Sequence, residues 1–137
     1  MTTSPSDLRL YADAERLDVV VTEGILQGRS NAHWYPEVRC VVLRIGLRYE
    51  VRRTCLGHEL GHVEFGHPPG CDPCIYARQE RVADEYAARI LITRSEYKEA
   101  EAQHGPCVPA LAHHLQVTEA LVRTWRSMEL RRIESES

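Results

Sequence analysis

The stretch that decides the fold is Tyr49-Glu-Val-Arg-Arg-Thr-Cys-Leu-Gly-His-Glu-Leu-Gly-His-Val-Glu-Phe65, which contains the pattern H-E-x-x-H from His58 to His62. Apolar and histidine residues recur along it at helical spacing, which predicts one helix capped by Gly66. Residues four apart share a helical face, so both imidazoles can reach one metal ion. Glu59 flanks that position and is the candidate general base, acting on a metal-bound water.

Two histidines do not complete a zinc site that performs hydrolysis, because such a site takes three protein ligands. A metzincin would place a third histidine at residue 68, where this chain has Pro68. We expect Glu80, on the next predicted helix, to be the third ligand. Asp84, one turn further on, is expected to accept a hydrogen bond from the far nitrogen of a metal-bound histidine. The alternative is that both carboxylates lie on a solvated helix face.

The rest of the chain predicts one α+β domain over residues 1–137: a small antiparallel or mixed sheet packed on about five helices, as in a minimal zincin-like metallopeptidase. Residues 1–6 are expected to be disordered, and the loop 67–74 to be non-helical because it contains three prolines. An edge of the sheet is expected to receive an extended substrate. Strands are expected near 19–21 and 33–45, and helices over 8–17, 49–65, 75–92, 96–103 (with Ser95 as N-cap), 109–115 and 119–133.

Composition excludes several classes of protein. The chain has 137 residues, of which 43% are hydrophobic and 27% charged, as in an ordinary globular domain. Its net charge of −3 provides no overall attraction to nucleic acid. No apolar run approaches the roughly 20 residues of a membrane span, and the N-terminus lacks the features of an export signal. We therefore expect a cytoplasmic protein that does not bind membranes, with reduced cysteines.

Three further side chains are candidates to stabilise the oxyanion of a peptide transition state: Tyr76, His33 and His67. Tyr76 is favoured because it lies one turn before Glu80. A weaker signal is Cys71-Asp-Pro-Cys74, whose C-x-x-C spacing can hold a second metal. We expect two free thiols instead, because a closed site needs four ligands.

The segments Arg53-Thr-Cys-Leu-Gly-His-Glu-Leu-Gly-His62 and Glu80-Arg-Val-Ala-Asp-Glu-Tyr-Ala87 resemble the ImmA/IrrE-type zinc metallopeptidases. The resemblance extends over about residues 38–133. It implies a thermolysin-like site with one Zn²⁺ per chain, and it implies a protein substrate, often a DNA-binding repressor. The implied roles are as follows: His58, His62 and Glu80 are ligands, Glu59 is the general base, and Asp84 stands at the family's Asn/Asp position. Val82 and Tyr86 depart from the family pattern, which bears on packing and substrate choice.

A rival function rests on residues 108–133, whose spacing is that of a helix-turn-helix. On this alternative the protein is a regulatory DNA- or repressor-binding module in which zinc is structural. Between Thr118 and Ser137, however, four arginines are balanced by four glutamates, whereas a DNA reader normally carries a basic excess. We therefore expect a helical subdomain that packs on the catalytic part and binds nucleic acid weakly.

Overall fold

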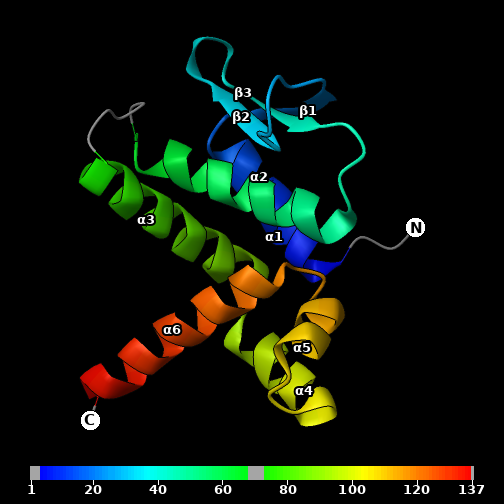
Figure 1. The fold of residues 1–137 in the computed structure, drawn as a ribbon, viewed down its shortest axis with the longest axis vertical. Coiled ribbons are helices and arrows are strands. Elements are labelled where there is room, and N and C mark those ends of the chain that lie inside the picture. The colour runs from blue at the N-terminus through cyan, green and yellow to red at the C-terminus, as the bar shows by residue number, and fades with distance from the viewer. Residues whose placement is uncertain (1–3, 68–72, 137) are drawn as a thin grey trace.

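The computed structural model describes residues 4–67 and 73–136 and confirms the predicted α+β fold. Figure 1 shows a small sheet at one end of the molecule, next to α2, and the last three helices at the other end. The elements are α1 (Pro5–Arg16), β1 (Val20–Gly24), β2 (Ala32–Tyr35), a 3₁₀ turn (Pro36–Val38), β3 (Cys40–Arg44), α2 (Tyr49–Glu64), α3 (Pro73–Leu91), α4 (Arg94–His104), α5 (Val108–Leu115) and α6 (Glu119–Glu136). Among these residues, no helix is long and apolar enough to span a membrane.

The sheet is mixed and has the strand order β1-β3-β2. β1 runs parallel to β3, and β2 runs antiparallel to it, so β2 forms one edge. The expectation of one extended stretch over 33–45 was wrong in its middle. The 3₁₀ turn and Arg39, whose φ is 47°, reverse the chain between β2 and β3. Val41 and Leu43 alternate into the core, which fixes the register of the central strand.

The N-terminal segment corrects another expectation. Residues 1–6 were predicted to be disordered; residues 1–3 lie outside the described residues, but α1 begins at Pro5, and Ser6 is buried. The oxygen of the Ser4 side chain accepts a hydrogen bond from the backbone N–H of Asp7, as an N-cap does. The helix starts early because Pro5 is pre-organised for the first helical position.

α2 and α3 pack together unusually closely, and small residues make this possible. A Cβ built on Gly61 would lie 2.8 Å from the Cα of Ala83, and one on Gly57 would lie 2.9 Å from the Cβ of Ala87. Ala83 and Ala87 are fully buried. The most buried positions of α2 are nevertheless these glycines and their neighbours Leu56 and Leu60. The predicted face through His58 and His62 is half-buried and borders the candidate site.

Two helix starts differ from prediction for local reasons. α3 begins at Pro73 and not at Ile75, because proline is tolerated in the first turn of a helix. α4 is capped by Thr93 and not by Ser95. The Thr93 hydroxyl accepts from the N–H of Glu96, whose carboxylate accepts from the N–H of Thr93. This reciprocal capping box outcompetes a single serine.

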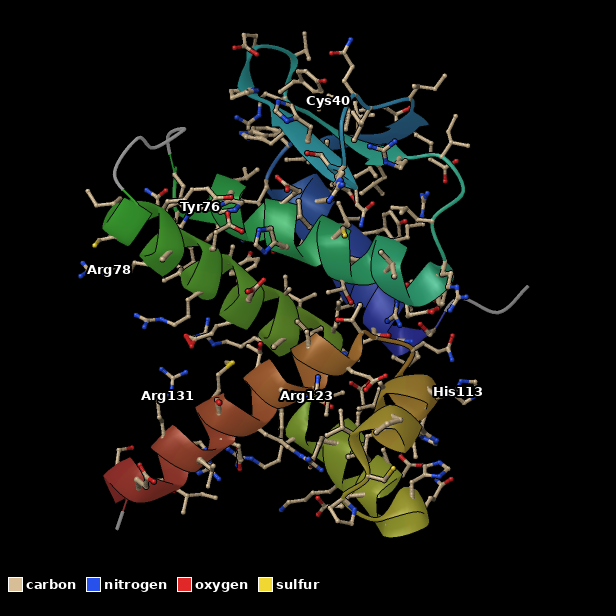
Figure 2. The ribbon with its side chains drawn as sticks, in the orientation of Figure 1. Cys40, Tyr76, Arg78, His113, Arg123 and Arg131 are labelled. Atoms are coloured by element: carbon tan, nitrogen blue, oxygen red, sulfur yellow. The ribbon has the colours of Figure 1, made fainter. Side chains whose placement is uncertain are left out.

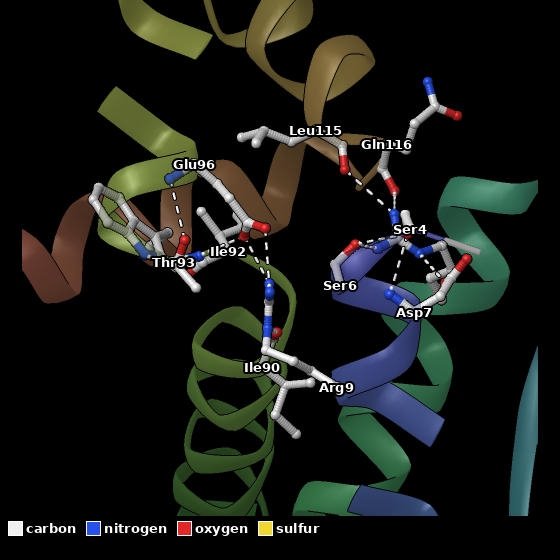
Figure 3. A network of polar contacts seen from close by, with 12 residues as sticks. Ser4, Ser6, Asp7, Arg9, Ile90, Ile92, Thr93, Glu96, Leu115 and Gln116 are labelled. Carbon is white, nitrogen blue, oxygen red and sulfur yellow. Dashed lines mark hydrogen bonds and ion pairs between the residues drawn. The ribbon is translucent and has the colours of Figure 1, made fainter. Parts of the chain in front are cut away.

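A buried arginine on α2 connects this helix to α1 and to the turn after α5. The Arg53 side chain is almost fully buried and donates to Asp7 at 2.8 Å, to the hydroxyl of Ser6, and to the carbonyl of Gln116 at 2.7 Å. Figure 3 shows these acceptors converging from α1 and from the turn after α5. The same view shows Arg9 bridging α1 to the carboxylate of Glu96. The bonds of Arg53 therefore connect α1 and the turn after α5 to the helix that carries H-E-x-x-H.

α5 and α6 are joined by a three-residue turn over residues 116–118, the connection length of a helix-turn-helix unit. Gln116 stands where such turns usually have glycine, and it adopts the left-handed conformation with φ 56°. The residues at the positions where a helix-turn-helix unit packs are all buried: Ala112, Val117, Val122 and Trp125. They belong to the same core as α2 and α3, so the pair packs on the rest of the fold.

Candidate metal centre

The structure brings the three predicted ligands together between α2 and α3. The Nε2 atoms of His58 and His62 lie 3.0 Å apart. Each is 2.9 Å from a different carboxylate oxygen of Glu80. Among the described residues, these three form the group of histidine, cysteine and carboxylate side chains that could hold a metal ion. Two imidazole nitrogens and a carboxylate are a donor set typical of hydrolytic zinc sites.

The outer nitrogens of both histidines are occupied by other side chains. His58 Nδ1 lies 2.6 Å from Asp84 Oδ1, as the spacing of Glu80 and Asp84 predicted. His62 Nδ1 lies 3.0 Å from Nδ1 of His67. In both rings Nε2 is therefore the nitrogen directed at the centre, which is the arrangement a metal requires.

Burial and the surrounding carboxylates change the acidity of the site. Burial lowers the pKa of His58, but Asp84 and Glu80 outweigh it and raise the pKa overall. Burial and the nearby His58 lower the pKa of His62. Burial, reinforced by the charge of Glu80, raises the pKa of Glu59. The site thus contains a carboxylate whose affinity for protons is increased, as suits a general base.

A cavity of about 530 Å³ opens onto this group. Its walls come from the edge strand β2, the end of α2 and the start of α3, and it reaches Glu59, His62 and Glu80. Trp34 on β2 is half-buried against the core, which holds this strand beside α2. The cavity therefore combines a free strand edge, a general-base candidate and the candidate metal ligands.

All three candidates for oxyanion stabilisation line this cavity: Tyr76, His33 and His67. Tyr76 lies on the first turns of α3 (Figure 2) and is about half exposed. His33 is exposed on β2 and packs against the ring of Tyr35. His67 differs from the other two because it contacts a candidate ligand directly. The sequence identified His67 as a candidate oxyanion donor but not as a partner of His62.

The two secondary signals have different outcomes. Cys71 lies outside the described residues, and Cys74 is exposed at the start of α3, so free thiols there stay a prediction. On α6, the two arginines that could meet phosphate in the rival DNA-binding function have intramolecular partners. Arg123 lies 3.6 Å from Glu119, and Arg126 donates to the hydroxyl of Tyr97 and the carbonyl of Pro106.

Comparison with known proteins agrees with this geometry. The model of the IrrE N-terminal-like domain, peptidase family M78, matches residues 14–124, which include both motifs and most of the fold. No curated protein matches the chain. A match over that length, together with the two motifs, identifies the chain as a member of peptidase family M78, a family of metallopeptidases.

Proposed function

We propose that the protein is a zinc-dependent endopeptidase. The observation that carries the proposal is the convergence of His58 Nε2, His62 Nε2 and Glu80 on one point at the end of a cavity. Membership of a metallopeptidase family supports it. His58, His62 and Glu80 would hold the metal, because nitrogen and carboxylate donors with engaged outer nitrogens fit zinc.

The chain's own residues divide the remaining work. Zinc, when bound, supplies Lewis acidity, which makes water acidic near pH 7 and polarises a carbonyl group. Glu59 takes a proton from the attacking water on its carboxylate and delivers it to the leaving amine. Asp84 holds the ring of His58 by accepting from Nδ1–H. Tyr76 lines the cavity, and its hydroxyl would donate a hydrogen bond to the developing oxyanion.

The cavity supports an extended polypeptide as substrate. β2 is an edge strand, so its outer N–H and C=O groups can pair with a peptide laid alongside it. That peptide would pass Glu59, which lines the same cavity. The resemblance to ImmA/IrrE-type enzymes makes a DNA-binding repressor the first candidate for the protein cleaved.

Two variants test the proposal, with bound zinc and hydrolysis measured on the same samples. Glu59→Gln is expected to keep one zinc per chain and the fold but to lose hydrolysis of an unstructured protein substrate, because an amide cannot take the proton. Glu80→Ala is expected to lose zinc, because it removes one of three protein ligands.

The controls separate the two roles. Glu64→Gln, on the same helix and outside the cavity, should leave zinc content and hydrolysis unchanged. If Glu59→Gln hydrolyses the substrate as fast as the parent, the general-base mechanism is wrong. If Glu80→Ala keeps a full zinc, the third ligand is another residue, and Asp84 and His67 are then tested in the same way. Two zincs per chain would indicate a further site that includes Cys71 or Cys74.

A further inference from the structure

His67 is the second side chain, besides Asp84, that contacts a candidate metal ligand from outside. Its Nδ1 lies 3.0 Å from His62 Nδ1, and the two rings meet edge to face with centroids 5.2 Å apart. Phe65 stacks on the His67 ring, with centroids 5.8 Å apart and the ring planes 19° apart. The imidazole of His67 therefore contacts both His62 and Phe65.

The backbone explains why a residue five positions after His62 returns to it. Gly66 follows the last turn of α2 with φ 61°, a left-handed conformation that glycine adopts at no steric cost. The N–H of His67 then bonds back to the carbonyl of His62 at 3.0 Å, and the N–H of Gly66 bonds to Val63. This is a Schellman motif, in which the residue after the glycine folds over the final turn of the helix. The Schellman cap therefore places His67 next to His62, at the C-terminal end of α2.

We propose that His67 is a positioning residue that sets the tautomer and orientation of His62 for metal binding. The inference rests on the proposed zinc site. Once His62 uses Nε2 as a ligand, its Nδ1 carries the proton and donates a hydrogen bond to Nδ1 of His67. The proton of the neutral His67 ring is then on its Nε2. His58 has a carboxylate in the equivalent place, so the two ligand histidines are held by acceptors of different charge.

The test is the zinc affinity of purified protein, measured by competition with a chromophoric chelator. His67→Leu removes the acceptor and is expected to weaken zinc binding about 10–100-fold, the usual effect of losing such a partner. His67→Asn keeps an acceptor oxygen close to the place of Nδ1 and should restore most of that affinity. His113→Leu removes an exposed histidine of α5 that does not line this cavity, and it should leave zinc affinity unchanged.

A spectroscopic measurement and a backbone variant test the same inference without changing the His67 side chain. In zinc-loaded protein labelled with ¹⁵N-histidine, the Nδ1–H of His62 should show coupling across a hydrogen bond to His67 Nδ1. Gly66→Ala should also weaken zinc binding, because alanine disfavours the left-handed conformation that brings His67 back. Gly66→Asn should be milder, since asparagine tolerates that conformation. If His67→Leu fails to fold, His67→Asn and the Gly66 pair decide the question.

The outcomes separate this inference from the proposed function. Parent-like zinc affinity in His67→Leu, or equal losses in the Leu and Asn variants, would overturn the role of His67 while leaving the zinc site intact. Zinc binding without hydrolysis in the parent would overturn the proposed function but not the role of His67. A parent that binds no zinc would overturn both.

Discussion

The close contact of α2 with α3 predicts that one methyl group will disturb the metal site more than it disturbs the fold. In Gly61→Ala the new Cβ would lie 2.8 Å from Ala83 Cα and 3.1 Å from the carbonyl oxygen of Ala83. Carbon atoms in contact normally lie about 3.5–4.0 Å apart, so the helices must separate locally by about 0.7–1.2 Å. Glu80 lies one turn before Ala83 and would move away from the histidines by a similar distance.

The expected effects on stability and on metal binding differ in size. Overpacking costs about 1–3 kcal/mol, and replacing glycine by alanine inside a helix offsets about 1 kcal/mol of that. The free energy of unfolding should therefore fall by about 0–2 kcal/mol. Metal–ligand distances tolerate only about 0.2 Å, so displacement of Glu80 should weaken zinc binding by at least about tenfold. Thermal unfolding of the metal-free protein and chelator competition measure the two quantities separately.

Gly57 provides an internal control one turn away. Its shortest contact would be with the Cβ of Ala87 at 2.9 Å, followed by the Cα of Ala87 at 3.2 Å. Gly57→Ala should therefore also weaken zinc binding, and the double variant Gly57→Ala, Ala87→Gly should recover part of that loss. The corresponding pair Gly61→Ala, Ala83→Gly should not recover it, because the backbone atoms of Ala83 remain in the way. Parent-like zinc affinity in Gly61→Ala would refute the view that helix spacing brings Glu80 to the histidines.

Three further predictions follow from other parts of the structure. Asp84→Ala should weaken zinc binding about 10–100-fold, and Asp84→Asn less, since its amide oxygen still accepts from His58; equal effects in chelator competition would contradict this. Burial raises the pKa of Glu96, but hydrogen bonds from Arg9 and Thr93 lower it overall. That stabilisation is present above the ordinary glutamate pKa of about 4.3 and is lost as pH falls through the lowered value. Glu96→Gln should therefore reduce stability in urea more at pH 7 than at pH 3, and equal losses would be evidence against this linkage. Duplex DNA should bind no more tightly than about 10 µM at physiological salt, and a sub-micromolar complex lost on neutralising Arg123 and Arg126 would overturn this.

The grouping of His58, His62 and Glu80 was predictable because each part has a local signature. His58 and His62 are one turn apart on a helix that the sequence predicts clearly, and Glu80 and Asp84 repeat that spacing on the next helix. The small side chains of Ala83 and Ala87 on the same helix indicate from the sequence that α3 can approach α2 closely. The matching glycines of α2 explain how close that packing is, and their effect depends on which residues face them across the interface.

The features that were missed depend on backbone conformation or on distant partners. Arg39 adopts a left-handed conformation without being glycine, so composition gave no signal for the reversal before β3. The turn before α6 was predicted, but not the left-handed conformation of Gln116 within it. Ser6 is ordered because Arg53, 47 residues later, donates to it. His67 was visible as a histidine near the site, but its contact with His62 requires the left-handed Gly66. The capping box at Thr93 had a readable signature, T-x-x-E, and was predictable.

The buried guanidinium of Arg53 has a consequence for the order in which the protein matures during synthesis. Two of its acceptors, in α1, are already available when α2 leaves the ribosome, but the carbonyls of Leu115 and Gln116 are made about 60 residues later. Until then the guanidinium lacks two of its hydrogen-bond acceptors, and burying a charged group without them costs free energy. We expect α2 to dock fully, and the metal centre to form, only after the α5–α6 turn has been synthesised. Nascent chains arrested before residue 107 has emerged should therefore not retain zinc, whereas chains arrested after α6 has emerged should.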